Sequence, residues 1–146
     1  MSDNTYLTGG NKSFYVHFAF EHEGLDCAIH DLQSSLRGPK KGLTTPQLAS
    51  RLTQLRDLMT RHFREEEEGC FDEICAQHPH MCPATRQMEA THRKLMKQID
   101  LLAQHLPAGK VTEDWKNQFE DFANAMQEHE DEEKAFVRRG LQLGEE

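Results

Sequence analysis

Apolar residues recur along this chain in steps of three and four, the spacing that places side chains on one face of an α-helix. Stretches rich in proline and glycine interrupt this rhythm at Gly38–Gly42, His78–Pro83 and Pro107–Gly109. The pattern therefore predicts four amphipathic helices, over about 13–37, 45–77, 84–106 and 112–139. Strands are not expected, because β-branched residues are few and no run alternates with a period of two.

Helix start signals support two of these segments. Pro46 follows Thr45 at the opening of the second segment, and Thr112 precedes two acidic residues at the opening of the fourth. Connectors of about six to ten residues favour antiparallel packing of neighbouring helices. We therefore predict an all-α fold and a single domain over 1–146. The expected arrangement is an up-down-up-down antiparallel four-helix bundle.

Each predicted apolar face contains one histidine, and two faces also contain a glutamate four residues after it. This interval places both side chains of a pair on the same side of a helix. A buried carboxylate without a partner costs several kcal/mol or is forced to stay neutral. A shared pair of metal ions would satisfy all of these groups together. The predicted metal ligands are His22, His62, Glu66, His92, His129 and Glu133.

The predicted ligands also lie at one height of the expected bundle. His22 and His92 fall in the first halves of their helices, whereas His62 and His129 fall in the second halves. Because successive helices of an up-down bundle run in opposite directions, all four histidines are expected at the same end. Imidazole and carboxylate ligands suit iron, manganese or zinc, and argue against a thiolate-preferring metal.

The overall charge narrows the range of partners. The formal net charge is −8, so non-specific binding to nucleic acid or to an anionic membrane is not expected. No apolar run approaches the roughly 20 residues of a membrane-spanning helix, and the polar N-terminus has no apolar stretch typical of a signal peptide. We therefore expect a cytoplasmic protein whose four cysteines, which include no CxxC pair, stay as thiols.

Two of the cysteines lie in an unusual stretch between the second and third segments. Cys75, His78, His80 and Cys82 fall within eight residues. They are consistent with a second metal site for a soft ion, with a redox-responsive disulfide, or with an ordinary loop. Their spacing matches no standard zinc motif, and the sequence leaves the three alternatives open.

The chain resembles the hemerythrin-like (HHE cation-binding) family from about Phe14 to Phe136. The motifs that carry the resemblance are Phe20-Glu21-His22, His62 to Glu67 with Phe71 following, Glu89 to His92, and His129 to Glu133. The resemblance implies a di-iron centre. In it His22 and His62 bind one iron, His92 and His129 bind the other, and Glu66 and Glu133 bridge the two ions. An oxo or hydroxo group is the implied third bridge, and Zn or Mn are possible substitutes for Fe.

The chain departs from the oxygen-carrying hemerythrins at two positions. Met88 stands where they have a further histidine, and His129 precedes its acidic partner by four residues rather than five. At both positions the chain is more similar to the bacterial hemerythrin-like, iron–sulfur-repair and iron-sensing members of the family. Glu89, three residues before His92, is a candidate replacement ligand; the alternative is an exposed glutamate beside the apolar face.

These features predict a non-haem di-iron protein that binds or senses O₂, NO, or redox or iron status at a dinuclear site of four histidines and two glutamates. Its expected partner is a small diatomic ligand, O₂ or NO, or peroxide. The alternative is a di-iron enzyme for iron–sulfur cluster repair or for reduction of peroxide or NO. A third interpretation is a helical interaction module with structural histidines. The sequence leaves enzymatic activity and the oligomeric state open.

Overall fold

The structure is a computed structural model that describes residues 9–37 and 43–141, with side chains described from Phe18 onward. These residues form helices and no strand, which confirms the prediction of an all-α protein. The four long helices of the described residues are α1 (Gly9–Arg37), α2 (Thr45–Glu66), α4 (Cys82–Gln104) and α5 (Glu113–Gly140). The predicted breaker at 38–42 lies outside the described residues.

The connection between α2 and α4 is helical for most of its length. α2 passes into a π-helical segment, η1 (Glu67–Phe71), which leads into α3 (Asp72–Gln77) and then into a short 3-10 turn, η2 (Pro79–Met81). The sequence predicts one continuous helix over 45–77 and misses the π-helical segment. A π-helical turn contains an extra residue. It shifts the buried face by one position, so that Cys70 and Phe71 are both buried.

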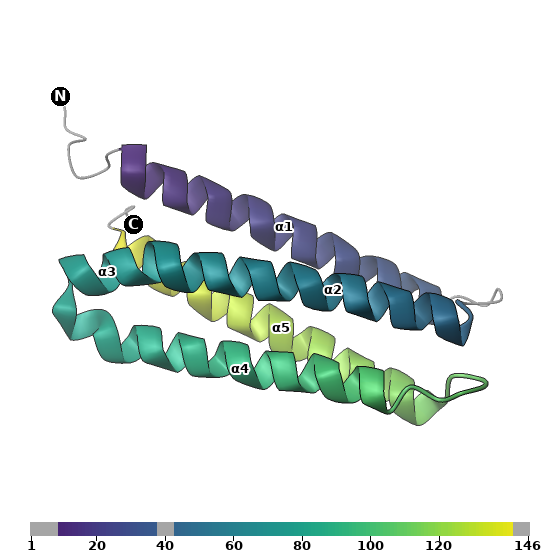
Figure 1. The fold of residues 1–146 in the computed structure, drawn as a ribbon. Coiled ribbons are helices and arrows are strands. Elements are labelled where there is room, and N and C mark those ends of the chain that lie inside the picture. The colour runs from purple at the N-terminus through teal and green to yellow at the C-terminus, as the bar shows by residue number, and fades with distance from the viewer. Residues whose placement is uncertain (1–8, 38–42, 142–146) are drawn as a thin grey trace.

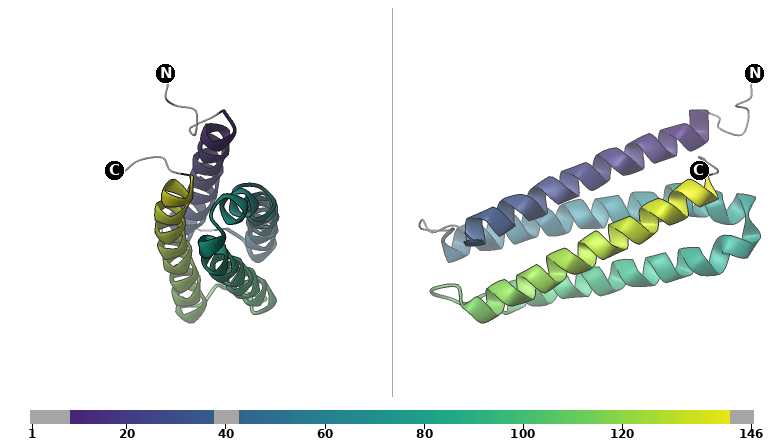
Figure 2. Two further views of the ribbon diagram at one scale, coloured as in Figure 1. Left: turned by 90° about the vertical axis from the view of Figure 1, so that its left-hand side faces the viewer. Right: turned by 180° about the vertical axis from the view of Figure 1, so that it is seen from behind.

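The long helices lie lengthwise against one another (Figure 1). α1 packs on α2 and α5, and α4 packs on the same two helices. In Figure 1, α1 begins and α5 ends at the left, where α3 also lies, and the α4–α5 connection is at the right. The end-on view of Figure 2 shows the helices grouped around a common interior. None of the described helices combines the length and the apolar character required to cross a membrane.

Local capping explains where α2 and α5 begin. The Thr44 hydroxyl accepts a hydrogen bond from the Gln47 backbone N–H at 3.2 Å, and the Gln47 side chain accepts one from the Thr44 N–H at 2.9 Å. This reciprocal pair satisfies two backbone donors that the helix itself leaves free. At α5 the Thr112 hydroxyl accepts from the Trp115 N–H at 3.1 Å. The cap of α2 is therefore Thr44, one residue before the predicted Thr45, whereas Thr112 caps α5 as predicted. Both caps act on nearby backbone atoms and need no tertiary contact.

The apolar interior is divided into two clusters. The larger occupies most of the bundle and includes Phe63 and Phe119; the smaller lies around η1, α3 and the end of α5 and includes Phe71 and Ile74. Phe63 and Phe71 both stack on the imidazole of His92. The polar residues singled out from the sequence therefore lie between two apolar clusters.

Substitution of Gly140, with Gly24 as the comparison, tests the packing at the end of the bundle. A Cβ added to Gly140 would lie 2.6 Å from Ile74 Cδ1, with two further Ile74 atoms within 2.8 Å, whereas a Cβ at Gly24 meets nothing within 4 Å. We expect Gly140→Ala to destabilise the protein by about 1–3 kcal/mol through overpacking. Gly24→Ala should stabilise it by about 0.5–1 kcal/mol through helix propensity. Urea unfolding measures both, and equal midpoints for the two variants would contradict this packing.

Candidate metal centre

Six buried residues from four helices meet between the two apolar clusters. They form two donor groups in which one ligand atom of each residue lies within 4.8 Å of those of the others. Both groups contain Glu66 from α2 and Glu133 from α5. The first group adds His22 and His62, and the second adds His92 and His129. The resemblance assigns the same pairs of histidines to the two ions; the role of these residues as ligands remains a prediction.

All four imidazoles present Nε2 to the two carboxylates. His22 Nε2 lies 3.2 Å from Glu66 Oε2 and 2.9 Å from Glu133 Oε1. The Nε2 atoms of His62 and His129 lie 2.6 and 3.1 Å from the glutamate four residues later on the same helix. His92 Nε2 lies 3.1 Å from Glu66 Oε1 and 2.9 Å from Glu133 Oε2. Each glutamate therefore faces histidines of both groups, the position that a bridging carboxylate requires.

Several of these polar atoms lack a hydrogen bond. His62 Nε2, Glu66 Oε1 and both ring nitrogens of His129 are buried without a partner of normal hydrogen-bond geometry. The short distance from His62 to Glu66 is thus a close approach whose angle is unsuitable for a hydrogen bond. Each unsatisfied buried polar atom costs about 1–3 kcal/mol. Metal coordination would satisfy His62 Nε2, Glu66 Oε1 and His129 Nε2, so the residues present fit a pair of metal ions.

The two buried carboxylates do not have the same protonation behaviour. Burial, together with the neighbouring Glu133 carboxylate, raises the pKa of Glu66 well above its usual value. Burial also acts to raise the pKa of Glu133, but contacts with His129, His22 and His92 outweigh it and hold that pKa well below its usual value. Without metal, Glu66 therefore holds a proton while Glu133 is ionised. A bound cation would displace the proton on Glu66.

Two of the histidines, His62 and His92, also differ from each other in their pKa values. Burial and the nearby His22 lower the pKa of His62 to about 3, so its imidazole is neutral and able to ligate. Burial acts to lower the pKa of His92 as well, but hydrogen bonding to Glu133 and Glu67 outweighs it and raises that pKa. Without metal, a proton on His92 therefore supplies part of the positive charge that bound metal ions would provide.

His92 is the most firmly positioned of the candidate ligands. Its Nδ1 donates to Glu67 Oε2 at 2.7 Å, which leaves Nε2 directed at the centre. Its ring stacks on Phe63 with a centroid separation of 3.9 Å, and on Phe71 at 5.6 Å. Glu67 and Phe71 are the first and last residues of η1. The π-helical segment therefore supplies two of the three contacts that orient this imidazole.

The structure buries a third glutamate beside the two predicted ligands. Glu130, which is not among the predicted ligands, has only 4% of its surface exposed. Burial, and next the side chain of Asp26, raise the pKa of Glu130 to about 9. The spacing of residues in the sequence contains a signal for this burial. Ala123, Met126, Glu130, Glu133 and Val137 follow steps of three and four, a second buried row on α5.

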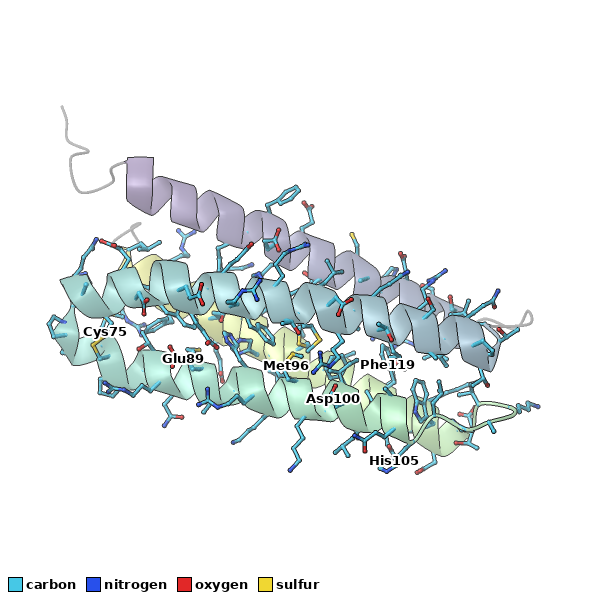
Figure 3. The ribbon with its side chains drawn as sticks, in the orientation of Figure 1. Cys75, Glu89, Met96, Asp100, His105 and Phe119 are labelled. Atoms are coloured by element: carbon cyan, nitrogen blue, oxygen red, sulfur yellow. A yellow bond between two sulfur atoms is a disulfide. The ribbon has the colours of Figure 1, made fainter. Side chains whose placement is uncertain are left out.

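Glu89 is not brought into either donor group. It lies half-buried on α4, where Figure 3 labels it, and the described residues that cluster as donors do not include it. Met88, at the position of the missing histidine, packs against the smaller apolar cluster. The donor groups of the described residues thus contain no replacement for the histidine that Met88 displaces.

The cysteine-rich stretch forms a disulfide. Cys75, labelled in Figure 3 at the end of the bundle, is bonded to Cys82, so the expectation of four thiols is wrong for this pair. This link excludes a soft-metal site that uses both sulfurs, and His78 and His80 belong to no donor group of the described residues. Cys70 remains a thiol, and burial raises its pKa to about 12, which makes it unreactive.

Helices that enclose a cluster of imidazoles and carboxylates define a class of helical metal-binding proteins. The model of the hemerythrin HHE cation-binding domain matches residues 13–139, so the chain belongs to this family. No curated protein and no solved structure shows a significant match to the chain.

The contact between Glu67 and His92 leads to a first prediction about this site. Glu67→Ala removes the acceptor that orients the imidazole and should weaken metal binding by about 10–100-fold. Glu67→Gln keeps an acceptor oxygen and should lose less. The neighbouring exposed Glu68 provides the matched control, Glu68→Ala. Titration against a chromophoric chelator measures the affinity, and equal affinities of the two alanine variants would contradict a positioning role.

The raised pKa values of Glu66 and His92 lead to a second prediction. Both groups must lose their protons before they can ligate, so metal binding near pH 7 should release protons and should weaken as the pH falls. Calorimetric titration of the metal-free protein with Zn²⁺, in buffers with different ionisation enthalpies, counts these protons. Glu66→Gln should release fewer. A binding heat that is the same in every buffer would contradict the prediction.

Proposed function

We propose that this protein is a non-haem di-iron protein that reversibly binds, or senses, a small diatomic molecule such as O₂ or NO, or reports redox or iron status. In this proposal His22 and His62 hold one iron ion, and His92 and His129 hold the other. Glu66 and Glu133 bridge the two ions. The proposal includes a single domain whose long helices form an up-down-up-down antiparallel bundle, in keeping with the chain path of Figure 1.

The observation that carries this proposal is that the two donor groups share both of their carboxylates. Four imidazole nitrogens and two shared carboxylates lie together in a buried interior. One ion would leave one pair of histidines without a ligand role. Two ions bridged by Glu66 and Glu133 use every donor, and two metal ions about 3.5–4 Å apart can hold a small molecule between them.

The residues of the chain determine what such a centre can do. Six protein ligands leave coordination positions open on a pair of metal ions, and redox-active iron supplies reversible binding of diatomic molecules when it is bound. Phe18, Phe63 and Phe71 line the histidines and exclude bulk water from them. Imidazole and carboxylate affinity alone favours zinc over iron. The preference for iron therefore rests on the family.

A second candidate function is enzymatic, either repair of iron–sulfur clusters or reduction of peroxide or NO. The observation that favours it is the Cys75–Cys82 disulfide, because both residues are partly exposed and accessible to thiol exchange. Turnover of the iron-loaded protein with peroxide or NO, or iron transfer to an apo-ferredoxin, would support this function. Failure in all three assays removes it and leaves the binding or sensing function.

Metal content and the visible spectrum test the leading proposal. Protein from iron-supplemented cells should contain two iron ions per chain and show a visible ferric absorption band. Dithionite should abolish this band and air should restore it. His62→Ala and His129→Ala should each lose metal and unfold more readily, because the ions bind only the folded state; such linkage is worth about 3 kcal/mol when the metal is at 100 times its dissociation constant.

His105→Ala is the matched control, because His105 is an exposed histidine at the end of α4, away from the donor groups. It should keep the metal content, the spectrum and the unfolding temperature of the parent protein. If the parent protein binds neither iron nor zinc, the histidines are structural and the proposal is wrong.

A further inference from the structure

A cleft of about 500 Å³ lies between α1 and α5, lined by residues within 23–33 of α1 and 123–127 of α5. The two helices lie next to each other in the back view of Figure 2 and are in contact. Three carboxylates line the cleft, from Glu23, Asp26 and Asp31, and no lysine or arginine does. The amides of Gln33, Asn124 and Gln127 add further oxygen atoms. This lining is suited to a cation with a preference for oxygen ligands.

A buried acidic residue, Glu130, lies on α5 about one turn after the cleft-lining Gln127 and about one turn before Glu133. Glu130 is 4% exposed, and its Oε2 has no hydrogen-bond partner of normal geometry. On one side it interacts with Asp26, which lines the cleft. On the other side it acts electrostatically on Glu66 and Glu133, the two carboxylates shared by the donor groups. No ion pair joins Glu130 or Asp26 to a basic side chain in the part of the chain that is described.

These residues form a path of increasing burial. Asp26 is exposed at the cleft, Glu130 is almost completely buried, and Glu133 has no exposed surface. Each step passes from one carboxylate to the next, from α1 to α5 and then along one turn of α5. Acidic side chains at successive depths, without a basic partner among the described residues, are costly in an apolar interior. A cation that moves along them would have an oxygen ligand at every stage of losing its water.

We propose that the α1/α5 cleft is the entrance by which a divalent metal ion reaches the dinuclear centre, with Asp26 and then Glu130 as temporary ligands. This inference rests on the proposed metal-binding function and adds a route to it. The carboxylates of the cleft concentrate the ion near the protein, and Glu130 transfers it to Glu133 and His22, which already point at the centre. The ion keeps its charge throughout, and no redox step is involved.

The same residues do not form a third resident metal site. The donor groups found among the described residues contain neither Asp26 nor Glu130. Asp26 and Glu130 provide two carboxylates where a stable site needs more ligands. The arrangement therefore favours brief binding on the way to the centre, where four-residue donor groups hold the ion.

Uptake of Co²⁺ by the metal-free protein tests the route, because the visible bands of Co²⁺ report when it reaches an imidazole-rich site. We expect Asp26→Asn to slow uptake about tenfold, the lower end of what electrostatic focusing contributes to an association rate. Glu130→Gln should also slow uptake, because its amide is a weaker ligand for the ion than a carboxylate. The final stoichiometry and the final spectrum should match those of the parent protein. Added salt should slow the parent protein more than the double variant, because it screens the carboxylates of the cleft.

Glu132→Gln is the matched control, since Glu132 is an exposed carboxylate of α5 that does not line the cleft. It should load at the parental rate. Equal rates for all variants would overturn the proposed entrance while leaving the dinuclear centre intact. A lower final stoichiometry in Glu130→Gln, with an unchanged rate in Asp26→Asn, would also overturn it, because Glu130 would then only support the site. Absence of Co²⁺ binding by the parent protein would instead refute the metal-binding function itself.

Asp26→Asn alone is sufficient if Glu130→Gln does not fold, because Asp26 is exposed and lies on the surface of α1. Circular dichroism of the metal-free variants establishes this before uptake is measured. A parental loading rate in a folded Asp26→Asn variant would then overturn the entrance.

Discussion

The main constraint on this structure is the burial of two carboxylates and four imidazoles between two apolar clusters, which is energetically unfavourable. Glu66 and Glu133 approach each other closely enough that one is protonated and the other ionised when no metal is bound. Several nitrogen and oxygen atoms remain without hydrogen bonds. Such an arrangement is costly in an apolar interior unless a cation replaces the missing partners. The rest of the bundle holds these donors together despite that cost.

The π-helical segment after α2 connects this site to the packing of the bundle. It begins at Glu67, directly after Glu66, and ends at Phe71. From this segment Glu67 hydrogen-bonds to His92, and Phe71 stacks on the same ring. π-Helical turns weaken a helix and are frequent at functional sites. Here the π-helical turn coincides with the segment that contacts His92.

The acidic side chains of the bundle divide into three environments with different consequences. Those on exposed faces are hydrated and contribute mainly to the negative charge of the chain. Glu66 and Glu133 face four histidines in the interior. Glu130 and Asp26 lie between these two environments, and they interact with each other without a basic partner among the described residues. A graded series of carboxylates from solvent to interior therefore crosses the α1/α5 interface.

The sequence by itself determined the helices and the identity of the clustered donors. Steps of three and four define one face of each helix, and His62 with Glu66 and His129 with Glu133 share a face because i and i+4 always do. Thr44 and Thr112 act on backbone atoms three residues away, so their effect is also local. Only the tertiary structure decided which acidic residue orients His92 and that Cys75 and Cys82 are bonded. Each of these outcomes depends on the rotation and spacing of neighbouring helices, which one extra residue in η1 changes and which no periodicity within a single helix contains.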